Sequence, residues 1–147
     1  MSTITIGDPA DPLNFMGPLI SERQRSRVLA YIGTAEHEGG RIAFGGGRPT
    51  HLPRGYYVEP TLVTDVPAAS TIAQEEVFGP VLVVLAYEGD DQAVRIANDS
   101  AYGLSASIAS QSDERALSVA ARLRVGTCSV NGGQWMHMDV PFGGYKQ

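Results

Sequence analysis

The sequence contains a single cysteine, Cys128, and no long apolar run. One cysteine excludes an internal disulfide, and such usage is typical of a cytoplasmic protein. The longest apolar run, residues 81–87, is far too short to span a lipid bilayer, which takes about 20 residues. The first residues show neither the positive region nor the apolar segment of a signal peptide. We therefore expect a cytoplasmic chain with no membrane partner.

Charged residues are also few. They make up 18% of the 147 residues, and the net charge is −5 without any basic cluster. Nucleic acids and anionic membranes are therefore poor candidate partners. A chain with so few charges has little polar surface to spare, so we expect some apolar surface to face a partner. The 43% hydrophobic content supplies a core for one domain.

Metal and phosphate signatures are missing from the sequence as well. His37, His51 and His137 do not have metal-ligand spacing, so no metal site is predicted. Residues 45–47 are three glycines without the Lys-Ser/Thr of a phosphate loop, which indicates a turn. Lys146 follows two glycines and is interpreted as a solvated side chain.

The first half of the chain predicts an irregular arm, a helix and short extended segments. Residues 1–17 are broken by Pro and Gly, which favours the arm. Ser21 is a candidate N-cap with Gln24 three residues on, the pattern of a capping box. A strand is expected over 41–44, and Pro60 favours an edge or crossing position for the segment around it. The expected buried face of the helix comprises Ile20, Val28, Ile32 and Ala35.

From residue 80 the pattern predicts an α/β fold, with a parallel βαβαβ sheet unit. The run of residues 81–87 is typical of a strand buried on both faces, and right-handed crossovers make such strands parallel. The elements expected after it are a helix over 91–98, a strand over 104–109, a helix capped by Ser112 and a strand over 125–130. The resulting division is an arm (1–17), a helix with extended cover (18–79), the βαβαβ unit (80–131) and a final Gly-rich loop (132–147).

Cys128 is the candidate nucleophile that the sequence offers, and the pattern argues against it. It lies inside the expected strand of residues 125–130, with no neighbouring cation or helix N-terminus to lower its pKa. A free cysteine in such a place is usually a small buried hydrophobe. We interpret Cys128 as a structural thiol.

Several motifs across the chain resemble the NAD(P)-dependent aldehyde dehydrogenase family. The strongest is Glu-Glu-Val-Phe-Gly-Pro-Val at residues 75–81. Three more agree in family order: Gly-Pro-Leu-Ile-Ser at 17–21, Gly-Tyr-Tyr-Val-Glu-Pro-Thr-Leu at 55–62, and Pro-Phe-Gly-Gly-Tyr-Lys-Gln at 141–147. Each motif is modest alone, and together they indicate the C-terminal part of that family's catalytic domain.

This resemblance implies particular sites. Glu76 would accept hydrogen bonds from the nicotinamide-ribose hydroxyls of NAD or NADP, and Phe78 would pack beside that ribose. Glu75, by contrast, is expected to be a solvated loop residue. The loop of residues 131–142 resembles the wall of the aldehyde tunnel, where Phe142, Trp135 and Met136 would contact the substrate. The resemblance does not separate NAD from NADP, because the family reads that difference in another part of the fold.

The resemblance also identifies what this sequence does not contain. The family's nucleophilic cysteine motif (Asn-x-Gly-Gln-x-Cys), its general-base motif (Glu-Leu-Gly-Gly) and its pyrophosphate turn are absent. We therefore expect no catalytic residue in this chain and no aldehyde oxidation by the chain alone. A sheet unit without its neighbours would expose strand edges, so self-association as a homo-oligomer is expected. The alternative is a non-catalytic, stand-alone α/β module such as a gene remnant or an assembly fragment.

Overall fold

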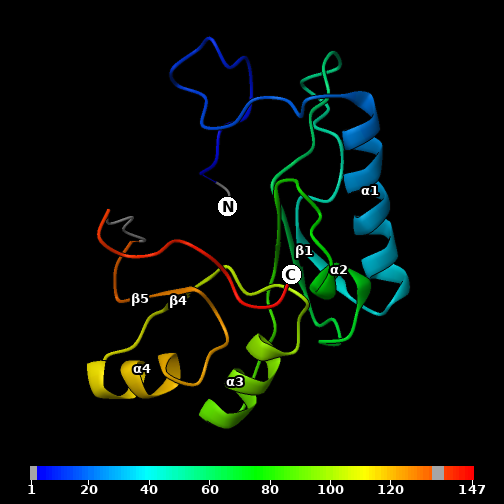
Figure 1. The fold of residues 1–147 in the computed structure, drawn as a ribbon. Coiled ribbons are helices and arrows are strands. Elements are labelled where there is room, and N and C mark those ends of the chain that lie inside the picture. The colour runs from blue at the N-terminus through cyan, green and yellow to red at the C-terminus, as the bar shows by residue number, and fades with distance from the viewer. Residues whose placement is uncertain (1–2, 134–137) are drawn as a thin grey trace. The chain divides into compact units, whose positions relative to one another are not determined.

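The chain folds as two compact units, Met1–Ala86 and Tyr87–Gln147, in a computed structural model (Figure 1). The structure describes residues 3–133 and 138–147. Both units combine helices with parallel strand pairs, which confirms the predicted α/β class. Within the described ranges, no helix has the length and apolar character needed to cross a membrane.

The first unit packs one long helix over a three-stranded sheet. Helix α1 spans Glu22–His37, and the short helix α2 spans Thr71–Gln74. The strands are β1 (Arg41–Phe44), β2 (Thr61–Thr64) and β3 (Val81–Val83), in the spatial order β1-β2-β3. Strand β1 is antiparallel to β2, whereas β2 and β3 are parallel. The connection that carries α2 is the crossover that a parallel pair requires.

The core of this unit forms where α1 meets the sheet. Val28, Ile32 and Ala35 lie on one face of α1 and are at most 3% exposed, as their spacing predicts. Ser21 is the N-cap, and its hydroxyl accepts a hydrogen bond from the Gln24 backbone, as predicted. Ile20 was expected on the buried face but is 88% exposed. It precedes an extended N-cap residue, so it does not follow the helical period.

Two expectations about the strands are wrong. Strand β3 is shorter than the predicted 81–87 and is not buried on both faces, since Leu82 is 53% exposed. It is an edge strand of its sheet, with β2 as its neighbour. Strand β2, next to Pro60, is central rather than at an edge. Pro60 lies just before the first strand residue, so its missing N–H removes no hydrogen bond from the ladder.

In its described residues, the second unit contains two helices and a parallel strand pair. Its elements are α3 (Gly89–Asn98), β4 (Ser105–Ile108), α4 (Asp113–Ala120) and β5 (Thr127–Val130). The chain order β3-α3-β4-α4-β5 is the predicted one. However, β3 joins the sheet of β1 and β2, so these strands are divided between two sheets. Strand β3 hydrogen-bonds to β2, an earlier strand that was not expected to be its neighbour.

Candidate functional site

The Glu75–Pro80 loop, between α2 and β3, carries the two residues predicted to contact a cofactor. Its side chains point in opposite directions. Val77 is buried in the core of the first unit, whereas Phe78 is 71% exposed and Glu76 is also exposed. Val77 therefore anchors the loop, and its two neighbours are presented outward.

Phe78 has an unusual backbone conformation. Its φ angle is +52°, in the left-handed region that bulky side chains rarely adopt. Such a conformation costs on the order of 1–3 kcal/mol and persists only where the surroundings hold it. The loop must therefore be fixed by contacts outside itself.

Helix α1 supplies these contacts through its side chains. The Gln24 amide nitrogen donates hydrogen bonds to the backbone oxygens of Val77 (3.3 Å) and Phe78 (2.8 Å). The Arg27 guanidinium donates to the backbone oxygen of Glu76 (3.1 Å). Gln24 and Arg27 are three residues apart and so share one side of the helix. Three consecutive loop carbonyls are thereby bound to α1.

A third residue of α1 binds the start of the loop. The Tyr31 hydroxyl donates a hydrogen bond of 2.5 Å to a carboxylate oxygen of Glu75. Arg27 donates to the Tyr31 oxygen (3.3 Å), and its guanidinium carbon lies 5.4 Å from the Tyr31 ring centroid. Hydrogen bonding and charge interaction with Tyr31 are the main causes that raise the pKa of the Arg27 guanidinium, and the nearby Glu75 and Glu76 carboxylates also raise it. Glu75 is exposed, as expected, but it is engaged by Tyr31 rather than only by solvent.

Glu76 is left available by this arrangement. Among the residues that the structure describes, no hydrogen bond or ion pair involves its carboxylate, so both oxygens can accept hydrogen bonds from a ligand. A vicinal diol offers two such donors. The neighbouring Phe78 ring offers an apolar face on the same loop. These two side chains therefore fit the ribose of a nicotinamide cofactor.

Gly79 is required by the packing under the loop. A Cβ built on Gly79 would lie 2.6 Å from a methyl carbon of Val28, which is fully buried in α1. Any larger residue would push the loop off the helix. The Gly-Pro sequence that marks the loop thus has a packing role.

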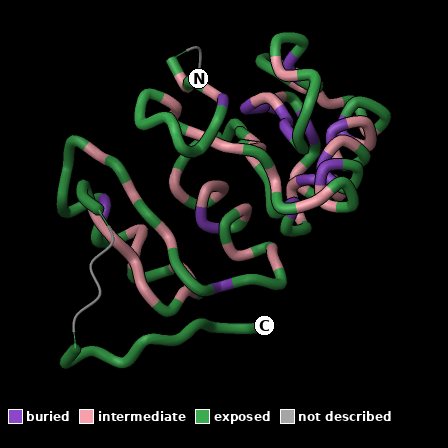
Figure 2. Tube along the Cα trace, turned by 90° about the horizontal axis from the view of Figure 1, so that it is seen from above, coloured by how far each residue is buried: buried purple, intermediate pink, exposed green. Residues whose placement is uncertain are grey.

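The residues predicted to contact substrate are located in the second unit or outside the described residues. Phe142 lies in the C-terminal segment, which is exposed throughout residues 138–147 (Figure 2), and is itself 68% exposed. Trp135 and Met136 lie outside the described residues. Glu76 and Phe78 share one loop of the first unit, whereas Phe142, the described member of the predicted substrate residues, belongs to the second unit.

The C-terminal segment is held by the second unit. The Tyr145 backbone donates to the Gly103 oxygen (3.0 Å). The Lys146 ammonium donates to the backbone oxygens of Asn98 and Ser100, both at 2.9 Å. Lys146 was expected to be only solvated, and this is wrong. Carbonyl oxygens at the C-terminal end of α3 lack helical partners, so a lysine charge is stabilised there.

Cys128 has the surroundings of a structural thiol. It lies in β5, opposite Ala106 of β4, and is half-buried. Burial raises the pKa of its thiol, so the group stays protonated near neutral pH. This supports its interpretation as a non-nucleophilic cysteine. In residues 3–133 and 138–147, no group of three or more His, Cys, Asp or Glu side chains could hold a metal ion.

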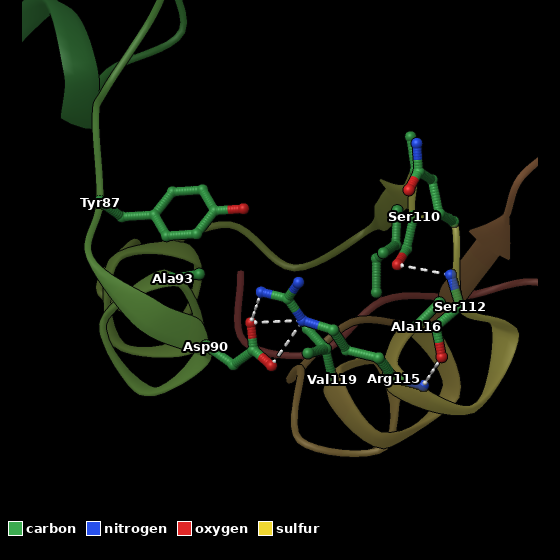
Figure 3. A pocket seen from close by; sticks show the side chains of 11 residues that line it. Tyr87, Asp90, Ala93, Ser110, Ser112, Arg115, Ala116 and Val119 are labelled. Atoms are coloured by element: carbon green, nitrogen blue, oxygen red, sulfur yellow. Dashed lines mark hydrogen bonds and ion pairs between the residues drawn. The ribbon is translucent and has the colours of Figure 1, made fainter.

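A cavity of about 540 Å³ in the second unit was not expected from the sequence (Figure 3). Its wall carries an ion pair in which Arg115 donates to both carboxylate oxygens of Asp90, with contacts of 2.5–3.1 Å. Hydrogen bonding by Arg115 lowers the pKa of Asp90. Because these charges compensate each other, they offer no net charge to a ligand. The remaining lining residues are Tyr87, Ala93, Ile108, Ala109, Ser110, Gln111, Ser112, Ala116 and Val119.

Comparison with known proteins gives consistent matches over the whole chain. The sequence model of the aldehyde dehydrogenase family matches residues 1–147. The betaine aldehyde dehydrogenase of Brucella anthropi is 43% identical over 146 residues, which cover 98% of this chain and 30% of the relative. The chain therefore spans about 30% of the length of the curated relatives that it matches.

Solved structures give the same result. Betaine aldehyde dehydrogenase from Staphylococcus aureus, solved in complex with NAD+, has a TM-score of 0.93 and 39% identity, covering 99% of this chain and 29% of that chain. An aldehyde dehydrogenase from Mycobacterium tuberculosis, also complexed with NAD+, has a TM-score of 0.90 and 44% identity, with coverage of 99% and 30%.

Proposed function

This chain belongs to the aldehyde dehydrogenase family, and we propose that it supplies the cofactor-ribose contacts of an NAD-dependent oxidation of an aldehyde to a carboxylic acid. The Glu75–Pro80 loop is the observation that carries the proposal. On a backbone that α1 fixes, it carries the exposed Phe78 ring and the Glu76 carboxylate, for which the described residues provide no hydrogen bond or ion pair. The structural neighbours solved with NAD+ favour NAD over NADP as the first cofactor to test.

Each side chain of the loop has a distinct part in this proposal. The ionised Glu76 carboxylate accepts hydrogen bonds from both hydroxyls of the nicotinamide ribose. The Phe78 ring lies beside the ribose and limits where the nicotinamide can swing. When bound, the cofactor would supply the hydride acceptor of the oxidation. The role of the chain's own residues is to bind and orient it.

The substrate side of the proposal rests on the C-terminal segment. Phe142, together with Trp135 and Met136, would form an apolar wall that excludes water from the aldehyde. The names of the curated relatives make betaine aldehyde the first substrate to test. The sequence lacks the family's nucleophile and general-base motifs, so the oxidation itself belongs to parts of the fold outside these 147 residues.

The cellular location of the chain and its association with further copies are also proposals. We infer a cytoplasmic location from its cysteine usage. We infer association with further copies from its exposed apolar side chains, which include Leu82, Leu104 and Leu117. Sedimentation at micromolar concentration tests this association, and a monomer would contradict it.

The cofactor contact can be tested on the 147-residue chain by saturation-transfer NMR with NAD+. We expect saturation of the nicotinamide-ribose protons in the wild-type chain, and its loss in Glu76→Ala. Glu36→Ala is the matched control, because Glu36 is an exposed glutamate on α1. Equal saturation in the Glu76→Ala and wild-type chains would contradict the proposed role of Glu76. A signal lost equally in the Glu36→Ala chain would show that the effect is only one of net charge.

A further inference from the structure

We propose that Tyr31 is a positioning residue whose hydroxyl locks the Glu75–Pro80 loop in the conformation that presents Glu76 and Phe78. This inference rests on the function proposed above, since it deepens the role of the same loop. Tyr31 itself need not touch the cofactor. It acts through Glu75 and Arg27.

The first step of the argument is the position of Tyr31 among the loop contacts. Its hydroxyl donates to Glu75 at 2.5 Å and accepts from Arg27 at 3.3 Å, so it joins a carboxylate to a guanidinium. Arg27 in turn donates to the Glu76 backbone oxygen. One hydroxyl thus connects the two residues that determine where the Glu76 peptide lies.

The second step concerns the choice between two adjacent glutamates. Glu75 and Glu76 follow each other in sequence, and either carboxylate could turn toward the positive charge of Arg27. Tyr31 engages Glu75, and a bond to a charged acceptor is stronger than one between neutral groups. With Glu75 held against α1, Glu76 is the carboxylate presented to a ligand. We call the hydrogen bond between the Tyr31 hydroxyl and the Glu75 carboxylate the latch. It gives different roles to Glu75 and Glu76, although their side chains are chemically identical.

The third step is the strain at Phe78. A bulky residue at φ +52° relaxes to negative φ unless its neighbours are fixed. Gln24 holds the peptide after Phe78, through the Phe78 oxygen. Before Phe78, Arg27 holds the Glu76 peptide oxygen and Tyr31 holds the Glu75 side chain. Removing the Tyr31 hydroxyl frees the part of the loop before Phe78. The outward direction of the Phe78 ring therefore depends on this hydroxyl.

Backbone ¹⁵N relaxation of the 147-residue chain tests the latch without cofactor. In the wild type we expect order parameters for residues 76–79 in the rigid range, about 0.85, and in Tyr31→Phe a fall toward the flexible range, below about 0.6. The phenylalanine keeps the ring and its stacking with Arg27, so the amides of Val28 and Ile32 should not change. Ser26→Ala removes a hydroxyl from the same helix without touching the loop and is the matched control. Unchanged order parameters in Tyr31→Phe would overturn the proposal.

A pair of substitutions at Glu75 separates a latch from a general structural effect. Glu75→Gln keeps an oxygen that can accept from Tyr31, so it should retain most of the loop order, whereas Glu75→Ala should resemble Tyr31→Phe. Equal loss in the two Glu75 variants would contradict a latch made by this hydrogen bond.

A titration with NAD+, followed on the amides of residues 76–79, connects the latch to function. We expect a dissociation constant about three- to tenfold larger for Tyr31→Phe than for the wild type, with Ser26→Ala unchanged. If the wild-type amides do not respond to NAD+ at millimolar concentration, the proposed cofactor role fails while the relaxation result still decides the latch. If Tyr31→Phe loosens the loop but binds NAD+ as the wild type does, Tyr31 is not a positioning residue for the cofactor.

Discussion

Gly79 and Val28 lie so close together that a Cβ on Gly79 would come within 2.6 Å of a Val28 methyl carbon. Val28 is fully buried and belongs to the core that α1 shares with the sheet. The loop carrying Glu76 and Phe78 is thus seated directly on the helix whose side chains bind its carbonyls. Close backbone approach and hydrogen bonding act together to give this loop one conformation.

Gly79→Ala should therefore destabilise the first unit. We expect a loss of about 1–3 kcal/mol, because the new methyl group overpacks a filled core. Gly33→Ala is the matched control, since Gly33 lies within α1 and a Cβ there meets nothing within 4 Å. That change should stabilise by about 0.4–1 kcal/mol through helix propensity. Urea denaturation measures both, and equal effects of the two substitutions would contradict the packing role of Gly79.

Loss of the helix cap is a second test. Ser21→Ala removes the acceptor for the Gln24 backbone N–H, which lies 3.2 Å from the serine oxygen. We expect a loss of about 1 kcal/mol in the free energy of unfolding. Ser26→Ala, on the exposed side of α1, should stay within about 0.5 kcal/mol of the wild type. A Ser21→Ala chain as stable as the Ser26→Ala chain would show that the cap contributes nothing.

The Asp90–Arg115 ion pair predicts a pH dependence for the second unit. Hydrogen bonding by Arg115 lowers the pKa of Asp90 below its ordinary value of 3.8. A carboxyl group whose folded pKa is depressed stabilises the fold above the unfolded pKa, and this contribution is lost as pH falls through the folded value. Asp90→Asn should therefore be less stable than the wild type at neutral pH.

The same comparison at low pH supplies the control. The difference between Asp90→Asn and the wild type should shrink as pH falls below 3.8, and it should vanish once Asp90 is protonated in both the folded and the unfolded state. Thermal unfolding followed by circular dichroism across this range measures it. A difference that stays constant with pH would mean that the ion pair is not its source.

Aldehyde-dependent reduction of NAD+ is the direct test of activity. We expect no turnover by the 147-residue chain over an aldehyde panel that includes betaine aldehyde, because the family's nucleophile and base motifs are absent. Burial raises the pKa of the Cys128 thiol, which argues against a substitute nucleophile. Turnover that disappears in Cys128→Ala would show that this thiol is reactive after all.

Much of the local structure could be predicted from the residues themselves. Ser21 was identified as a helix cap from its type and place, and Val28, Ile32 and Ala35 from their helical spacing. Caps and amphipathic faces depend on groups within a few residues of each other, so the sequence alone specifies them. The motif of residues 75–81, which contains Glu76 and Phe78, was likewise identified from the sequence alone. The cofactor role of these two residues remains a prediction.

The tertiary structure decided what joins distant parts of the chain. Tyr31 and Glu75 are 44 residues apart, and no local pattern indicates that one binds the other. The pairing of β3 with β2 and the binding of Lys146 at the end of α3 are likewise long-range outcomes. Hydrogen bonds of this kind form only where packing brings the partners together, because each one exchanges water for a protein group at a small net gain. Sequence therefore determined which elements and which candidate residues this protein has, and the folded chain determined which side chains hold them in place.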